Sequence, residues 1–81
     1  MTGTPLEADY RKLLGQNLRD WRKARGLSQE DLAFAAGIDR TYVSGIERGR
    51  RNPSLLMIAR LAEALGVTPG DLLAPRGREA P

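Results

Sequence analysis

The functional side chains of this sequence are mostly those of arginine and lysine, and they occur in two groups. In the first group, between residues 10 and 25, Asp20 stands among six basic residues: Arg11, Lys12, Arg19, Arg22, Lys23 and Arg25. The second group consists of neighbouring arginines: Arg48, Arg50 and Arg51. Guanidinium and ammonium groups hydrogen-bond strongly to phosphate oxygens, so both groups suit a polyanionic partner. Two solvated helix faces would give the same pattern, and charge alone does not decide between these interpretations.

Other reactive side chains are scarce. The 81 residues include no cysteine and no histidine, which excludes disulfides, thiol nucleophiles, imidazole bases and zinc fingers. The acidic residues are needed for helix caps and ion pairs, so we expect no enzyme, no cofactor, no metal and no small-molecule ligand. The longest apolar run, from Leu55 to Ala59, is too short for a membrane span, and the first residues lack a secretory pattern. We therefore expect a cytoplasmic protein.

Helices must position the basic groups, because the apolar residues recur with helical spacing. We predict an all-α domain over residues 9–74, with a flexible arm at 1–8 and a disordered tail at 75–81. The five expected helices span about 9–24, 29–36, 40–48, 55–65 and 69–73. Their ends are indicated by capping residues and by glycines: Ser28, Asp39, Ser54 and Thr68, with Gly26, Gly37, Gly49 and Gly66.

Residues 28–48 contain two short helices joined by a tight turn at Gly37. The first helix has Leu32, Ala33 and Ala36 on one face, and the second has an apolar face of Val43 and Ile46. Opposite that apolar face, the second helix presents polar or small residues: Arg40, Thr41, Ser44 and Gly45. This arrangement is typical of a helix-turn-helix motif.

The residues from 18 to 73 resemble the lambda-repressor and Cro-like (XRE-type) family of helix-turn-helix domains. The matching positions are Leu18-Arg19-x-x-Arg22, Gly26-Leu27-Ser28-Gln29-x-x-Leu32-Ala33-x-x-x-Gly37, Val43-Ser44-x-Ile46-Glu47-x-Gly49, Asn52-Pro53-Ser54-Leu55 and Ala62-x-x-Leu65-Gly66-Val67. The resemblance implies a compact five-helix fold and a transcriptional regulator whose recognition helix, about residues 39–48, lies in the major groove of double-stranded DNA. The alternative is an antitoxin-like module that uses the same fold to bind a protein.

The resemblance also implies roles for single residues. Arg40 would donate two hydrogen bonds to guanine, or else bind phosphate, and Thr41 would offer its methyl group to thymine. Gly45 would let the helix approach the groove closely. Residues 39–52 are also similar to the recognition segment of the controller proteins of restriction–modification operons, which adds Arg51 and Asn52 to the site. The expected base readers are Arg40, Thr41, Ser44 and Arg51, and the expected contacts to the DNA backbone are Ser28, Gln29, Tyr42, Arg50 and Asn52.

Two expectations concern positioning. In the family, the residues corresponding to Arg22 and Glu47 form a half-buried ion pair that fixes the first helix to the recognition helix. Tyr42 has an alternative role as a packing residue, which the sequence leaves open.

A domain of this size contacts too few base pairs for operator-level specificity, so we expect a homodimer on a palindromic operator. The last two helices must then supply the interface, for which we predict apolar residues off the inner face: Leu56, Met57, Leu72 and Leu73. The alternative is that Leu72 and Leu73 both cover the core of the single chain.

Overall fold

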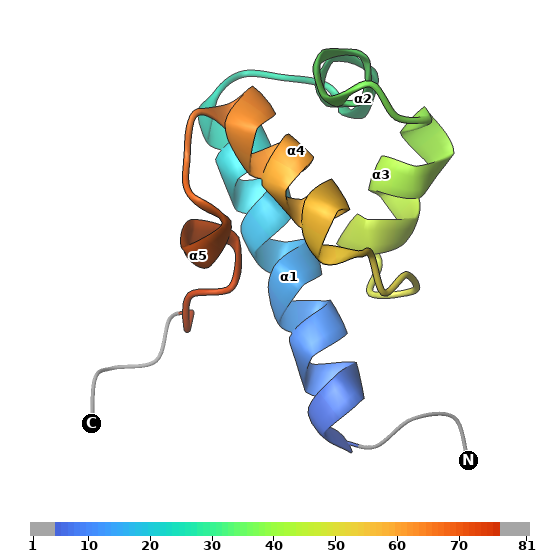
Figure 1. The fold of residues 1–81 in the computed structure, drawn as a ribbon, viewed down its shortest axis with the longest axis vertical. Coiled ribbons are helices and arrows are strands. Elements are labelled where there is room, and N and C mark those ends of the chain that lie inside the picture. The colour runs from blue at the N-terminus through green and yellow to red at the C-terminus, as the bar shows by residue number, and fades with distance from the viewer. Residues whose placement is uncertain (1–4, 77–81) are drawn as a thin grey trace.

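The structure, a computed structural model, describes residues 5–76. Within that range it contains five helices and no strand, which confirms the predicted all-α fold (Figure 1). The helices are α1 (Pro5–Ala24), α2 (Gln29–Ala36), α3 (Arg40–Glu47), α4 (Leu55–Leu65) and α5 (Pro69–Leu72). α2 and α4 match the predicted spans, while α3 and α5 each end one residue earlier than predicted, within the usual uncertainty of helix ends.

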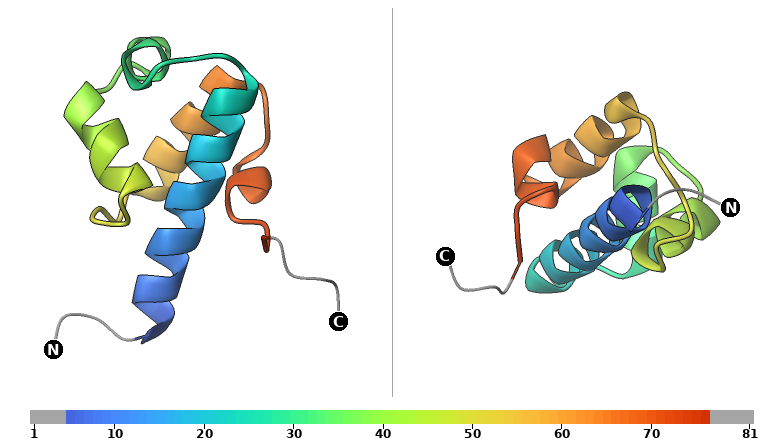
Figure 2. Two further views of the ribbon diagram at one scale, coloured as in Figure 1. Left: turned by 180° about the vertical axis from the view of Figure 1, so that it is seen from behind. Right: turned by 90° about the horizontal axis from the view of Figure 1, so that it is seen from below.

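The first helix starts at Pro5 rather than near residue 9, so residues 5–8 of the predicted arm are helical and only 1–4 lie outside the described residues. Proline is well accommodated at the first helical position, and Glu7 in the first turn complements the helix dipole. This end of α1 projects beyond the other helices (Figure 2), and Leu6 and Tyr10 on it are exposed. An end with exposed Leu6 and Tyr10 shows no regular apolar periodicity, which is why the sequence pattern missed it.

The core draws on all five helices, since the largest fully buried side chains are Leu18, Leu32, Val43, Ile46, Leu61 and Leu72. α3 packs against α1 and α2, and α4 packs against α2 and α5. Capping residues stabilise both ends of α2. Ser28 and Asp31 form a reciprocal capping box on α2, and Gly37 takes the predicted left-handed conformation at its end (φ 72°).

α1 and α3 cross at Gly15. A Cβ atom added there would lie 2.8 Å from the carbonyl oxygen of Glu47 and closer still to that of Ile46. No real side chain tolerates backbone at such a distance, so the crossing requires glycine. Because α3 carries the expected base readers, Gly15 helps to set where the recognition helix stands on the domain.

The C-terminal segment folds back against α1. Asn17, which is buried, donates from Nδ2 to the carbonyl oxygens of Leu72 and Ala74, both at 2.9 Å. Arg76 in turn donates to Asn17 Oδ1 at 2.8 Å and forms an ion pair with Asp20. Arg76 therefore has defined partners, contrary to the disorder predicted from residue 75 onward; residues 77–81 of that tail lie outside the described residues.

Candidate nucleic-acid interface

The start of α3 is organised by Asp39. Its Oδ1 accepts from the backbone N–H and from the hydroxyl of Thr41, both at 2.9 Å. The hydrogen bond from the Thr41 backbone, followed by that from its side chain, lowers the pKa of Asp39, and the charge of Arg40 adds to this effect. Asp39 is thus held ionised as the N-cap. The hydroxyl hydrogen of Thr41 is already engaged, which leaves its methyl group and oxygen lone pairs for a ligand.

The outer face of α3 borders a shallow depression of about 350 Å³. Its lining includes all four predicted base readers: Arg40, Thr41, Ser44 and Arg51. It also includes Arg50, a predicted contact to the DNA backbone, together with Gly45 and Arg48. The second basic group of the sequence thus joins the start of the recognition helix on one surface. Asn52 is placed differently, because it lines another hollow with Leu6 and Tyr10.

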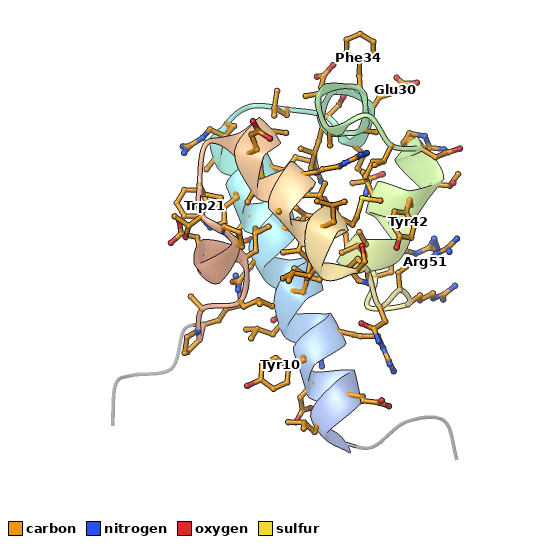
Figure 3. The ribbon with its side chains drawn as sticks, viewed as in Figure 1. Tyr10, Trp21, Glu30, Phe34, Tyr42 and Arg51 are labelled. Carbon is orange, nitrogen blue, oxygen red and sulfur yellow. The ribbon has the colours of Figure 1, made fainter. Side chains whose placement is uncertain are left out.

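Tyr42 and Arg51 face one another on this surface. The guanidinium carbon of Arg51 lies 5.0 Å from the centre of the Tyr42 ring, a distance at which a cation and an aromatic face attract (Figure 3). The ring is also half-buried and packs on the core. Tyr42 is therefore a packing residue and a partner of Arg51 at once, and its contact with the DNA backbone stays a prediction.

Arg22 and Glu47 lie in direct contact. Arg22 donates from Nε to Glu47 Oε2 at 2.7 Å and from its terminal nitrogen to Oε1 at 3.1 Å. Only 2% of the Glu47 side chain and 10% of the Arg22 side chain are exposed. A third hydrogen bond, to the Leu27 carbonyl at 2.9 Å, extends the link to the turn before α2. The pair therefore joins α1, that turn and α3.

Gln29 completes this network instead of extending freely outward. Its Nε2 donates to Glu47 Oε1 at 3.0 Å, a partner that the sequence did not indicate. The first backbone N–H groups of α2 have no partner within the helix, so they remain the groups at this end that suit a phosphate. The Ser28 hydroxyl accepts from the Asp31 backbone N–H at 2.9 Å, and the Ser28 backbone N–H donates to Asp31 Oδ2 at 3.1 Å. The hydrogen bond from the Ser28 backbone, followed by that from its side chain, lowers the pKa of the Asp31 carboxyl.

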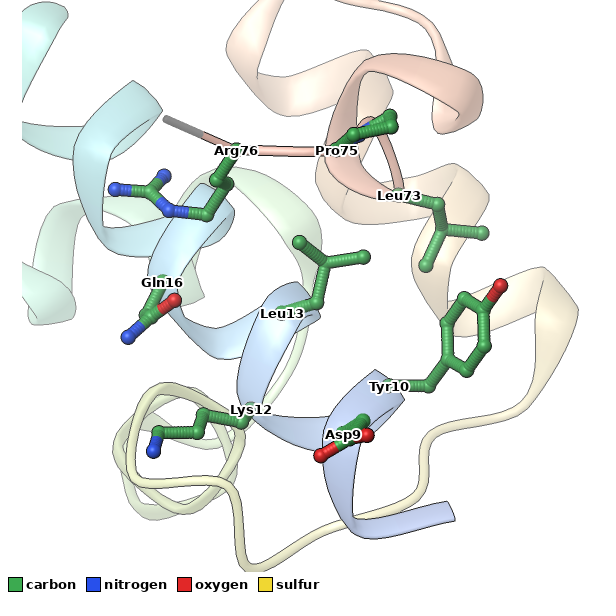
Figure 4. A pocket seen from close by; sticks show the side chains of 8 residues that line it. All are labelled: Asp9, Tyr10, Lys12, Leu13, Gln16, Leu73, Pro75 and Arg76. Carbon is green, nitrogen blue, oxygen red and sulfur yellow. The ribbon is translucent and has the colours of Figure 1, made fainter. Parts of the chain in front are cut away.

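The predicted interface residues fall into three environments. Leu56 is 65% exposed and Leu73 37% exposed, whereas Met57 is partly buried against the core. Leu72 is fully buried in the core, so its place in the predicted interface was wrong. The alternative, in which Leu72 and Leu73 both cover the core, agrees with the burial of Leu72 but not with the exposure of Leu73. At the end of short α5, the consecutive side chains of Leu72 and Leu73 therefore point in different directions. Figure 4 shows the Tyr10 ring beside Leu73, where both residues border a common pocket.

The sequence analysis did not indicate the structural contacts of three residues. Gly15 was detectable as a glycine inside a helical pattern, which often marks close backbone approach. Asn17 gave no signal, because its partners are main-chain carbonyls on a distant segment. Gly45 borders the side chain of Arg51, a contact that the sequence did not indicate, and its role in the close approach of DNA stays a prediction.

Two chemical features complete the description of residues 5–76. Their acidic side chains nowhere gather into a group able to hold a metal ion. None of their helices is sufficiently long and apolar to cross a lipid bilayer.

Residues 18–72 match the helix-turn-helix family HTH_3. The chain belongs to this family of DNA-binding transcriptional regulators, which are not enzymes. It is similar to the control protein C.BamHI of Bacillus amyloliquefaciens, with 52% identity over 66 residues that make up 80% of this chain and 82% of that protein.

Solved structures agree with the sequence comparison. The restriction–modification controller protein C.AhdI from Aeromonas hydrophila is 55% identical, with a TM-score of 0.75 over 76% of this chain and 94% of that one. The hypothetical transcription factor NHTF from Neisseria is 46% identical, with a TM-score of 0.82 over 94% of this chain and 87% of that one.

Proposed function

We propose that this regulator binds a palindromic operator as a homodimer, with the outer face of α3 in the major groove of each half-site. The observation that carries the proposal is the depression on α3, which brings the predicted base readers Arg40, Thr41, Ser44 and Arg51 onto one surface. A surface that combines guanidinium forks with a threonine methyl matches the pattern of groups along base edges.

The charge of the depression supports binding to a polyanion. Four arginines line it, and its lining includes no carboxylate: Arg40, Arg48, Arg50 and Arg51. The carboxylates at the two ends of α3 are engaged elsewhere, Asp39 in the helix cap and Glu47 with Arg22. Each phosphate neutralised by such a surface contributes about −0.9 to the slope of log affinity against log salt, so affinity should fall steeply with salt.

The proposed dimer uses exposed apolar residues of α1, of α4 and of the segment that follows α5. Leu56 and Leu73 remain from the sequence prediction, and the structure adds exposed Leu6, Tyr10 and Leu55. Leu6, Tyr10 and Leu73 border one hollow between the start of α1 and the end of α5. Covering such side chains with a second copy would remove apolar surface from water, which stabilises association by about 25 cal/mol per Å² before entropic costs.

We further propose a role of the controller type. The identity of 55% with the restriction–modification controller C.AhdI supports it, because the match covers 94% of that protein. The operator that this chain selects should then occur beside the genes of a restriction–modification system.

Selection of bound sequences from random duplexes tests the proposal. We expect enrichment of an inverted repeat whose half-sites lie about one helical turn apart. Enrichment of a single half-site would reject the homodimer on a palindrome. No enrichment, together with capture of a protein partner by the same surface, would favour the antitoxin-like alternative.

A further inference from the structure

Arg51 follows the recognition helix in sequence but lies on its outer face in space. The chain reverses at Gly49, where φ is 73°, a conformation that favours glycine. The next backbone N–H, from Arg50, donates to the Gly45 carbonyl at 2.9 Å. This return brings Arg51 to the depression that Arg40 also lines.

Two contacts define where the Arg51 side chain lies on α3. Its guanidinium carbon is 5.0 Å from the centre of the Tyr42 ring, and Figure 3 shows both residues on the same side of the helix. Its aliphatic part lies over Gly45: a Cβ atom added at residue 45 would be 2.8 Å from Arg51 Cγ and 3.1 Å from Nε. Any larger residue at position 45 would therefore displace Arg51.

We propose that Gly45 and Tyr42 are positioning residues that hold Arg51 over the recognition helix so that it reads a base pair. The inference rests on the proposed function and deepens it. An arginine that is free in solution loses rotamer entropy when it is immobilised at an interface. Tyr42 is itself fixed by packing on the core, so its ring offers a stationary surface on which the guanidinium is placed before DNA arrives.

The test compares Gly45→Ala, Arg51→Ala and the double variant. The probes are a duplex selected from random sequences by the wild-type protein and copies of it with each base pair changed in turn. Arg51→Ala should reduce discrimination at one base pair by about 5- to 150-fold, the range for a bidentate base contact. Gly45→Ala should reduce discrimination at that same base pair by about fivefold or more. The double variant should lose no more discrimination there than Arg51→Ala loses alone.

Two outcomes would overturn the proposal. If the loss of discrimination in the double variant equals the sum of the losses in the two single variants, the new methyl group at residue 45 obstructs DNA by itself and does not act through Arg51. If Arg51→Ala weakens all the duplexes equally, Arg51 contacts phosphate and reads no base.

Folding is checked separately. The atoms nearest to the added Cβ at residue 45 all belong to the Arg51 side chain, and alanine is the better helix former, so Gly45→Ala should melt at or above the wild-type temperature. Gly70→Ala is the matched control, because the nearest atom there, Thr68 Oγ1, is 3.6 Å away; it should leave discrimination unchanged. Tyr42→Leu keeps an apolar side chain on the core but removes the ring, and should act like Gly45→Ala.

A measurement without DNA separates this inference from the proposed function. The Tyr42 ring current should shift the NMR signals of the Arg51 side-chain protons upfield relative to those of exposed Arg60, and Gly45→Ala should abolish the shift. A shift that persists in Gly45→Ala would overturn the positioning role of Gly45. A wild-type protein that shows the shift but selects no duplex would reject the proposed function while supporting the placement of Arg51.

Discussion

The carboxylate of Glu47 accepts two hydrogen bonds from the guanidinium of Arg22, at 2.7 and 3.1 Å, and only 2% of its side chain is exposed. The contact ties the end of the recognition helix to α1. A buried charge of this kind adds little net stability when paired but is costly when its partner is removed.

Arg22→Ala should therefore lower the free energy of unfolding by about 3–5 kcal/mol, because Glu47 loses its main partner in a buried site. Urea denaturation followed by circular dichroism measures this. Arg19→Ala is the matched control: its Nε is 3.9 Å from Glu47, but its side chain is 57% exposed, so the cost should stay below about 1 kcal/mol. Equal losses in the two variants would show that Glu47 does not depend on Arg22.

Adjacent leucines of the C-terminal segment should behave differently. Leu72→Ala opens a cavity in the core and should reduce stability by about 2–5 kcal/mol, as measured by urea denaturation. Leu73→Ala should leave the stability of the monomer nearly unchanged but raise the dissociation constant of the dimer in sedimentation equilibrium. A wild-type protein that remains monomeric at micromolar concentration would contradict the proposed interface.

Arg40→Ala should relax the preference at one base pair of the operator by about 1–3 kcal/mol, because the variant loses a two-donor contact to a base. Binding to variant duplexes in a fluorescence anisotropy titration measures the change. Arg60→Ala on α4 is an exposed arginine outside the depression and serves as the control. A uniform loss of affinity for all duplexes would instead assign Arg40 to phosphate.

Acid should weaken the start of the recognition helix through Asp39. The hydrogen bonds from Thr41 hold the folded-state pKa of this carboxyl below its ordinary value of 3.8. A carboxyl group whose pKa is lower in the folded state stabilises that state fully at a pH above the ordinary, unfolded-state pKa. This contribution is lost as the pH falls through the folded-state pKa. Asparagine caps helices about as well but does not titrate. Thermal unfolding between about pH 6 and pH 2 should therefore show a smaller loss for Asp39→Asn than for the wild type; parallel curves would contradict this.

Much of the fold could be predicted because its signals are local. Ser28 and Thr68 mark helix starts through hydrogen bonds to residues three positions later, and the inner faces of α2 and α4 repeat with helical spacing. The start of α1 escaped prediction, because its large apolar side chains, Leu6 and Tyr10, are exposed and leave no regular apolar pattern.

The sequence indicated residues that the structure brings to one surface, but it did not indicate their geometry. Family resemblance pointed to Arg40, Thr41, Ser44 and Arg51, yet it gave no indication that Arg51 lies over Gly45. That contact depends on the chain reversal at Gly49, and the bond from Gln29 to Glu47 depends on how α2 meets α3. Such relationships arise from tertiary packing, which spacing along the chain does not encode.

The measurement that tests the central claim most directly is the selection of duplexes by the intact protein, followed by titration of the selected site at several salt concentrations. We expect an inverted repeat with half-sites about one helical turn apart, and an affinity that falls steeply as salt rises. Recovery of random sequence, or binding to duplex DNA that is insensitive to salt, would contradict the claim that the α3 surface reads operator DNA.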